Sequence, residues 1–131
     1  MAVYIQHKDT EQVLDVKESD TEPGAEVVLY TYYATPNQHW KFRDGLIVSE
    51  LSGLALDVDA ASGKLVTAAE SGAPSQRWTP EDGGLLRNGD GRFLTAVYPE
   101  AEDGDVSLAA SPERCDQPAA QEFALVPAEA S

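Results

Sequence analysis

One short pattern occurs three times along the 131 residues, each time in the same order. In every copy, a Gly turn leads into a short strand-like segment, and the loop that follows ends in a glutamine, any residue and an aromatic residue. The three triplets are Gln38-His39-Trp40, Gln76-Arg77-Trp78 and Gln121-Glu122-Phe123. Each copy also has an apolar residue that lies ten positions before a polar one. These pairs are Ile5 and Asp15, Ile47 and Asp57, and Leu85 and Thr95. Internal repeats of this kind decide the architecture before any other feature does.

The repeat predicts an all-β fold. Its apolar residues alternate over short segments, which is typical of strands, and no segment has the longer periodicity of a helix. The strong turn signal Asn88-Gly89 predicts a hairpin, because both residues tolerate positive φ. Propellers usually need at least four blades. Three repeats of about 40 residues around a pseudo-threefold axis are therefore the more economical arrangement.

We expect one domain over residues 1–131, a usual length for a single domain, with repeats at about 1–42, 43–80 and 81–126. Trp40, Trp78 and Phe123 are expected to fill equivalent places in its core.

The charge balance argues against several classes of partner. The chain has 23 Asp and Glu against 9 Lys and Arg, which gives a net charge of −14. Nucleic acids and anionic lipid surfaces are bound through Lys and Arg, so neither is expected as a partner. No apolar run approaches the roughly 20 residues that span a bilayer, so membrane insertion is not expected. The acidity itself favours solubility.

The cysteine content and the first residues bear on the cellular compartment. Cys115 is the single cysteine, so no intramolecular disulfide can form. Met1 to Ile5 lead directly into strand-like sequence, without the basic and apolar regions of a signal peptide. The expected location is the cytoplasm, or outside the cell after secretion by a non-classical route.

Together these residues resemble the ricin-B-type β-trefoil lectins. The resemblance covers about residues 3 to 126 and includes the Gln-x-aromatic triplets, the upstream segments Leu14-Asp15-Val16 and Leu56-Asp57-Val58, and the Gly turns between them. It implies a β-trefoil fold in which each repeat can carry a shallow sugar pocket. Many members bind galactose or N-acetylgalactosamine. Many secreted members also have disulfides within the repeats, which this chain lacks.

The resemblance implies one complete sugar site, in the first repeat. Asp15 matches the family carboxylate that accepts hydrogen bonds from two sugar hydroxyls. Tyr30 matches the aromatic residue that stacks on the sugar. Strand alternation supports this match, since Val27 and Leu29 should face inward while Val28 and Tyr30 face outward. Asn37 and Gln38 match the polar side of the site. Val28 departs from the family, which often has a polar residue there.

The other two repeats match the family site less well. In the second, Asp57 and Gln76 are kept, but Ala68 replaces the aromatic residue and Ser75 replaces the asparagine, so a second sugar site at Asp57, Ser75 and Gln76 is the weaker prediction. In the third, Gln121 is kept, but Thr95 replaces the aspartate, Ala109 or a neighbour replaces the aromatic residue, and Ala120 replaces the asparagine before Gln121. We therefore expect galactose-containing glycans to bind at the first repeat.

Each of these residue types also has an ordinary structural role. An aspartate such as Asp15 or Asp57 often stabilises a turn. Gln38 and Gln76 are suited to bonding the backbone of the loops that they close. Tyr32 and Tyr33 either widen the binding surface or pack under the loop. A shallow site of this kind is expected to bind a sugar with a Kd on the order of 0.1–1 mM.

No catalytic function, metal or cofactor is predicted. His7 and His39 do not have metal-ligand spacing, and Cys115 lies in an acidic segment that does not favour a thiolate. The competing prediction is a β-trefoil protein-interaction module or protease inhibitor that acts through its loops at residues 17–24, 98–105 and 110–120. The oligomeric state is left open, although a homodimer would raise the avidity of one weak site.

Overall fold

The computed structural model describes residues 2–99, 106–112 and 118–128. Cys115 and parts of the loops predicted at residues 98–105 and 110–120 lie outside these ranges. The strands are β1 Ala2–His7, β2 Val13–Val16, β3 Val27–Tyr30, β4 Trp40–Arg43, β5 Leu46–Ser49, β6 Ala55–Val58, β7 Leu65–Ala68, β8 Trp78–Glu81, β9 Leu85–Asn88, β10 Phe93–Val97, β11 Ser107–Ser111 and β12 Phe123–Pro127. Four short 3-10 helices are η1 Lys17–Ser19, η2 Pro36–Gln38, η3 Pro74–Gln76 and η4 Pro118–Gln121.

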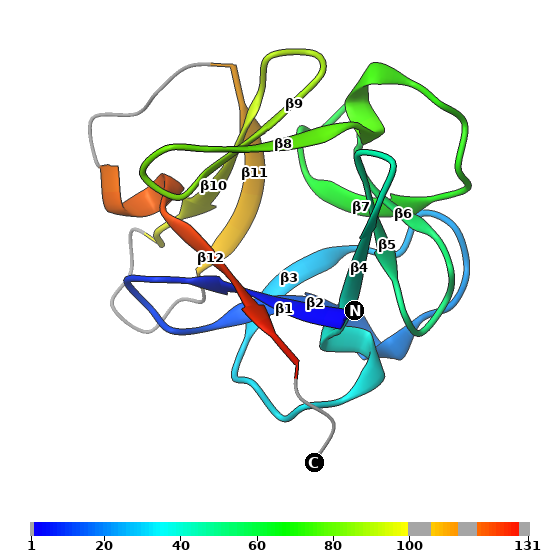
Figure 1. Cartoon of the computed structure of the whole chain (residues 1–131), viewed down its shortest axis with the longest axis horizontal. Helices are drawn as coiled ribbons and strands as arrows, with labels where there is room; N and C mark the ends of the chain where they lie inside the picture. Colours follow the sequence, from blue (N-terminus) through cyan, green and yellow to red (C-terminus); the bar gives the residue numbers. More distant parts are fainter. Residues whose placement is uncertain (1, 100–105, 113–117, 129–131) are drawn as a thin grey trace.

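The strands form three similar lobes around a central axis, as Figure 1 shows. Strand β1 pairs with both β4 and β12, and the pairs β4–β5 and β8–β9 are antiparallel hairpins. Backbone bonds join the lobes at corresponding places, because the Trp78 N–H donates to the Gly45 carbonyl and the Phe123 N–H donates to the Gly84 carbonyl, both at 2.8 Å. The predicted all-β trefoil with three repeats is confirmed.

Three further hairpins pack together: β2–β3, β6–β7 and β10–β11. They meet through short backbone bridges, one between Glu26 and Val66 and one between Lys64 and Ala109. Pairing within each hairpin follows the same register, since Asp15, Asp57 and Thr95 face Val28, Val66 and Ala109. Equivalent positions in the three repeats can therefore be compared residue by residue.

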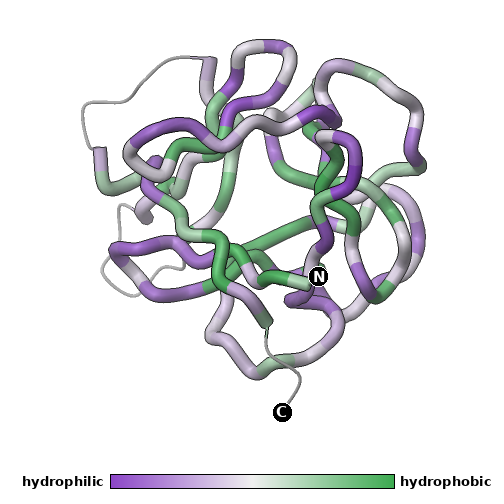
Figure 2. Tube along the Cα trace, in the orientation of Figure 1, coloured by the Kyte–Doolittle hydropathy of each residue, from purple (hydrophilic) through white to green (hydrophobic). Residues whose placement is uncertain are grey.

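The aromatic residues of the three triplets lie in the core, as predicted. Trp40, Trp78 and Phe123 are all buried. The two tryptophans also make matching hydrogen bonds, from Trp40 Nε1 to the Leu14 carbonyl at 3.3 Å and from Trp78 Nε1 to the Leu56 carbonyl at 3.0 Å. Figure 2 shows apolar sequence along the inner strands and polar sequence on the outer loops. In the first two repeats, the tryptophan is thus hydrogen-bonded to the strand that carries the aspartate.

The predicted hairpin at Asn88-Gly89 exists, but the reason for its glycine differs from the prediction. Positive φ occurs at Gly91 (82°) and not at Asn88 or Gly89. A side chain at Gly89 would come within 2.7 Å of the Pro74 carbonyl oxygen, to which the Gly89 N–H donates at 2.9 Å. Gly89 is therefore required by close contact with the second repeat.

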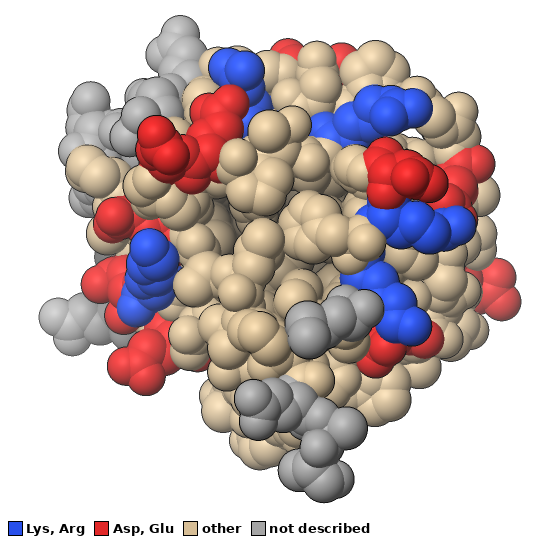
Figure 3. Space-filling model, in the orientation of Figure 1, with Lys and Arg blue, Asp and Glu red and all other residues tan. Residues whose placement is uncertain are grey.

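Charged side chains lie around the rim of the face shown in Figure 3, and uncharged residues occupy its middle. Arg43 forms an ion pair with Glu70, in which Arg43 Nη2 lies 2.7 Å from each carboxylate oxygen. Exposed pairs of this kind contribute about 0–1 kcal/mol. In the part of the chain that the structure describes, none of the helices has the length and apolar character needed to cross a membrane.

Candidate functional site

The β2–β3 hairpin places a carboxylate and an aromatic ring on one face. Asp15 lies opposite Val28, and Val13 lies opposite Tyr30. Facing residues of an antiparallel pair project to the same side, so Asp15 and Tyr30 share a face. Tyr30 is 53% exposed. The residues that alternate with it, Val27 and Leu29, are buried, as the sequence predicted.

Two side-chain amides hold the Asp15 carboxylate. Asn37 Nδ2 donates to Asp15 Oδ1 at 3.0 Å, and Gln38 Nε2 donates to Asp15 Oδ2 at 2.9 Å. Both amides come from η2, which begins at Pro36, a residue favoured at the first position of a helix. A carboxylate oxygen has two acceptor positions, so each oxygen of Asp15 keeps one for another donor. The carboxylate can therefore accept two hydroxyl groups from a ligand without losing its support.

Gln38 lies beneath the carboxylate, with only 1% of its surface exposed. Its second N–H donates to the Thr31 carbonyl at 2.8 Å, and its carbonyl oxygen accepts the Tyr33 N–H at 2.7 Å. Both N–H groups of the amide are thus used inside the protein. In this geometry Gln38 closes the loop and orients Asp15.

Asn37 lies closer to the surface, at 8% exposed. Besides its bond to Asp15, its Nδ2 donates to the Val16 carbonyl at 3.1 Å. Its Oδ1 accepts the Thr35 hydroxyl at 2.5 Å. Both N–H groups are used, so the remaining capacity of Asn37 is as an acceptor at Oδ1.

Burial raises the pKa of Asp15 above the ordinary value of 3.8. The cause is desolvation, which disfavours the charged form and which the hydrogen bonds from Gln38 and Asn37 oppose. Asp15 is only 7% exposed, so its carboxylate has lost most of its contact with water. A ligand that donates hydrogen bonds to the remaining acceptor positions would replace these lost contacts. The carboxylate is therefore suited to binding neutral hydrogen-bond donors.

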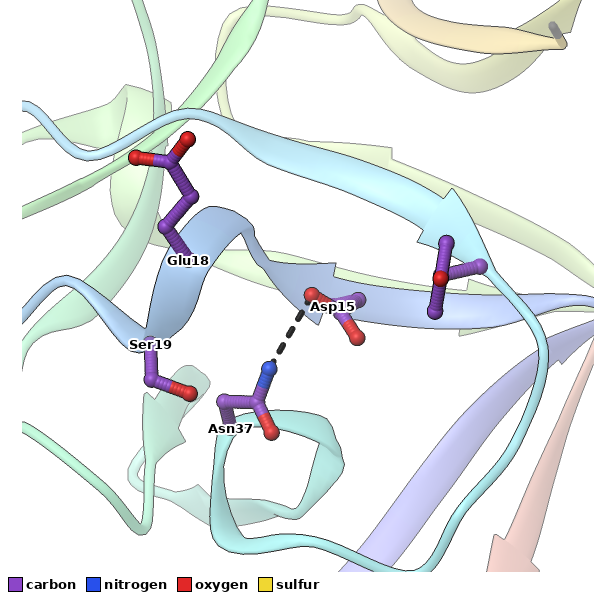
Figure 4. A pocket seen from close by; sticks show the side chains of 5 residues that line it. Asp15, Glu18, Ser19 and Asn37 are labelled. Atoms are coloured by element: carbon purple, nitrogen blue, oxygen red, sulfur yellow. Dashed lines mark hydrogen bonds between the residues drawn. The ribbon is translucent and has the colours of Figure 1, made fainter.

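A pocket of about 330 Å³ opens over these groups. Its lining residues are Asp15, Glu18, Ser19, Tyr30 and Asn37. In Figure 4, Asp15 and Asn37 point toward one another from β2 and η2, and Glu18 and Ser19 lie on the adjoining loop. The pocket brings together three of the residues that the sequence predicted.

Glu18 and Ser19, which also line the pocket, were not predicted as site residues. Both have positive φ, 59° and 52°, although neither is glycine. Such backbone conformations are costly and are often found at functional sites. The one signal available from the sequence was the length of the loop at residues 17–24, which contains both.

The structure separates the roles of the two neighbouring tyrosines. Tyr32 packs on Tyr4, with ring centroids 4.0 Å apart, and its hydroxyl is 2.9 Å from His39 Nε2. Tyr33 is 64% exposed, and its ring centroid lies 6.0 Å from that of Tyr30. Tyr32 therefore supports the loop, and Tyr33 widens the exposed aromatic surface.

The second repeat keeps the carboxylate and its glutamine. Gln76 Nε2 donates to Asp57 Oδ2 at 3.1 Å, as Gln38 does to Asp15. The other oxygen, Asp57 Oδ1, accepts the N–H of Val58 at 2.7 Å. Ala68 faces Ala55 in the register that Tyr30 has with Val13, so no ring covers this site.

A separate cavity of about 170 Å³ lies near Ser75, but Asp57 does not line it. Of the three residues of the weaker prediction, Ser75 lines this cavity, and Asp57 and Gln76 are joined by their hydrogen bond. Sugar binding at these residues stays a prediction. The 170 Å³ cavity is instead bounded in part by Asp90 and Arg92 of the third repeat.

The third repeat has a hydroxyl in place of the carboxylate. Gln121 Nε2 donates to Thr95 Oγ1 at 3.1 Å, and this hydroxyl donates to the Phe93 carbonyl at 2.9 Å. The register places Ser111, opposite Phe93, at the position of Tyr30. Ser111 is thus the neighbour of Ala109 that replaces the aromatic residue.

Both histidines have structural contacts. His7 is buried, with Nε2 2.8 Å from the Ala119 carbonyl and Nδ1 2.9 Å from Thr10 Oγ1. His39 lies between the Tyr32 hydroxyl and the Glu50 carboxylate. Within residues 2–99, 106–112 and 118–128, no group of three or more His, Cys, Asp or Glu side chains is placed to hold a metal ion.

Comparison with solved structures identifies related folds. The designed threefold-symmetric protein ThreeFoil is 24% identical, with a TM-score of 0.77 over 96% of this chain and 98% of its own. The C-half of an earthworm R-type lectin, solved in complex with GalNAc, is 19% identical, with a TM-score of 0.77 over 95% of this chain and 97% of its own. The β-trefoil lectin of the Vibrio vulnificus hemolysin/cytolysin, solved with N-acetyl-D-lactosamine, is 18% identical, with a TM-score of 0.78 over 99% of this chain and 96% of its own.

The family comparison covers most of the sequence. No curated protein matches the chain. The family described as the ricin-type beta-trefoil lectin domain matches residues 1–123. This match spans all three repeats, and the resemblance predicted from the Gln-x-aromatic pattern is confirmed. The chain therefore belongs to the ricin-type β-trefoil lectin family.

Proposed function

We propose that this protein is a lectin of the galactose or N-acetylgalactosamine type, with its working site in the first repeat. The observation that carries the proposal is one pocket that contains a supported carboxylate and an exposed ring. Asp15 has an acceptor position left on each oxygen, and Tyr30 offers the exposed ring. In the described residues of the second and third repeats, Ala68 and Ser111 occupy the register position of Tyr30.

A sugar fits this arrangement because its two sides differ. Hydroxyl groups on one side can donate to Asp15, and hydrogen bonds to a charged acceptor contribute about 1.5–3 kcal/mol each. The C–H groups on the other side can lie against Tyr30, which removes apolar surface from water without a deep pocket. Asn37 Oδ1 supplies a further acceptor. Gln38 acts from below, by fixing the carboxylate.

Binding without catalysis is part of the proposal. The family is described as a lectin domain, and Asp15 is held by two amides in an arrangement that accepts hydrogen bonds. Two similar structures were solved with GalNAc and with N-acetyl-D-lactosamine bound. Those sugars are ligands of those proteins, and they support galactose-type sugars as the first ligands to test.

The proposal can be tested by NMR titration of the ¹⁵N-labelled protein with galactose, N-acetylgalactosamine, lactose and glucose. We expect shifts at the amides of Asp15, Tyr30, Asn37 and Gln38, and the order of affinities would name the sugar class. The amides of the corresponding residues in the second repeat serve as an internal control. An unchanged spectrum at tens of millimolar of every sugar would contradict the proposal and favour a protein partner bound through the loops.

A further inference from the structure

A second hollow adjoins the Asp15 pocket and shares a wall with it. This groove has a volume of about 370 Å³ and runs between β3 and the beginning of β11. Tyr30 lines both the groove and the pocket. Val28, which faces Asp15 across the hairpin, lines the groove as well. The two hollows therefore adjoin at Tyr30.

The lining of the groove has both apolar and polar parts. Val28 and Val106 supply apolar surface from two different repeats. Lys17 and Glu26 supply a donor and an acceptor, and neither side chain forms an ion pair in the part of the chain that the structure describes. An apolar surface with a few convergent polar groups is typical of sites for small ligands, which have volumes of at least about 300 Å³.

Building on the proposed function, we propose that the groove holds the second sugar unit of an oligosaccharide whose first unit occupies the Asp15 pocket. Because Tyr30 lines both the pocket and the groove, one ligand can extend from the first into the second. The second sugar can rest its C–H groups on Val28 and Val106, and its hydroxyls can bond Lys17 and Glu26. The ligand class is therefore a disaccharide or longer glycan, and the first repeat recruits the third to recognise it.

The second unit is a neutral sugar. Glu26 lines the groove and Glu18 lines the adjoining pocket, so a carboxylate or sulfate on the sugar would meet like charges. Lys17, which also lines the groove, offsets part of this negative charge. The net charge of −14 adds a repulsion that increases at low ionic strength.

The test compares methyl galactoside with disaccharides that carry galactose at the non-reducing end in 1→3, 1→4 and 1→6 linkage. Affinities are measured by isothermal titration calorimetry. We expect at least one disaccharide to bind about tenfold more tightly than methyl galactoside, which corresponds to about 1.4 kcal/mol. Equal affinities for methyl galactoside and all the disaccharides would overturn the groove assignment and leave the proposed function intact.

Substitutions in the groove test whether the second sugar unit binds there. Ser107 is exposed and lines the groove at the start of β11, so Ser107→Trp should fill the groove. We expect this variant to lose the disaccharide gain and to keep its affinity for methyl galactoside. Lys64 has the same register position in the second repeat and is also exposed, so Lys64→Trp is the matched control and should keep the gain.

Two further variants keep the test decisive if Ser107→Trp does not fold. Lys17→Ala should reduce the disaccharide gain alone, because it removes a donor from the groove. Tyr33→Ala should not change the gain. If the gain disappears in Tyr33→Ala and persists in Lys17→Ala, the second sugar lies over the Tyr30–Tyr33 surface and the groove assignment is wrong. If no sugar binds at all, the proposed function itself fails.

Discussion

The first and second repeats hold a carboxylate in the same way but build different surroundings for it. In both, a buried glutamine donates to an aspartate, at 2.9 Å for Gln38 and Asp15 and at 3.1 Å for Gln76 and Asp57. In the first repeat a ring and an asparagine complete the site. In the second, Ala68 takes the place of the ring, and Asp57 turns one oxygen to its own backbone neighbour.

The loops between the hairpin strands add to this difference. Ten residues separate β2 from β3, and six separate β6 from β7. The longer connection contains Glu18 and Ser19, which form one wall of the 330 Å³ pocket. The glutamine and the carboxylate are thus common to the first two repeats. Under the proposed function, the carboxylate binds sugar where the ring, the asparagine and the longer loop surround it, as they do in the first repeat.

The largest effect is expected from Asp15→Ala. It removes both acceptor positions, so galactose affinity should fall at least about a hundredfold, or about 3 kcal/mol. The corresponding change Asp57→Ala should leave the affinity unchanged. NMR titration of both variants measures this. A similar loss of galactose affinity in both variants would mean that the first and second repeats bind the sugar alike.

Tyr30→Ala should reduce galactose affinity about tenfold, because the sugar loses the surface that covers its C–H groups. Tyr30 is half-exposed and outside the core, so the thermal unfolding midpoint should change little. Calorimetric titration gives the affinity, and Tyr30→Phe is the control that keeps the ring. An unchanged affinity in Tyr30→Ala would show that the carboxylate alone carries binding.

Binding should also depend on pH through Asp15. Burial raises its pKa, and the ionised form is the one that accepts two hydroxyls. Affinity should therefore be constant near neutral pH, be about halved when the pH equals the raised pKa, and continue to fall below it. Titrations at decreasing pH measure this, with circular dichroism to confirm that the fold persists. A midpoint at or below the ordinary value of 3.8 would contradict the burial argument.

The raised pKa of Asp15 also affects folding stability, but with the opposite pH dependence: sugar affinity decreases as the pH falls, whereas this contribution to stability increases. The folded state holds the proton more tightly than the unfolded chain does, so this contribution favours folding below the ordinary pKa of aspartate. It is lost as the pH rises through the raised pKa. The difference in unfolding free energy between the wild type and Asp15→Asn, followed against pH, isolates this contribution from the other acidic residues.

The smallest effect is expected from building the missing groups into the second repeat. Ala68→Tyr with Ser75→Asn restores the ring and the amide beside Asp57. A second set of galactose-dependent shifts should appear around Asp57, weaker than the first because the short loop supplies no wall. The single variant Ala68→Tyr is the control. Affinity equal to that of the first repeat would show that the longer loop is dispensable.

The sequence was sufficient for the fold because the fold depends on repetition. The alternation in each hairpin and the three Gln-x-aromatic triplets predicted the buried Trp40, Trp78 and Phe123. The resemblance to the family then identified Asp15 and Tyr30 as residues of one site. Both lie in elements whose register is fixed by the repeat.

What escaped prediction depends on irregular backbone and on contacts between repeats. Glu18 and Ser19 line the pocket through a loop with positive φ, and no periodic pattern encodes that conformation. The groove joins β3 to Val106, which is distant in sequence. The close contact of Gly89 with Pro74 has the same origin, because it forms only when two repeats pack together.

The pairing of β1 with β12 has a consequence for how this chain can be rearranged. Five consecutive residues of β1, from Val3 to His7, face residues of β12, and the Ala128 N–H donates to the Ala2 carbonyl at 2.9 Å. The ring of strands is thus closed by backbone hydrogen bonds between its first and last members. A short linker between these strands, with new ends opened in the turn between β5 and β6, would keep every strand pair. The residues of the Asp15 pocket would then occupy new positions along a circularly permuted chain, with their arrangement in space unchanged.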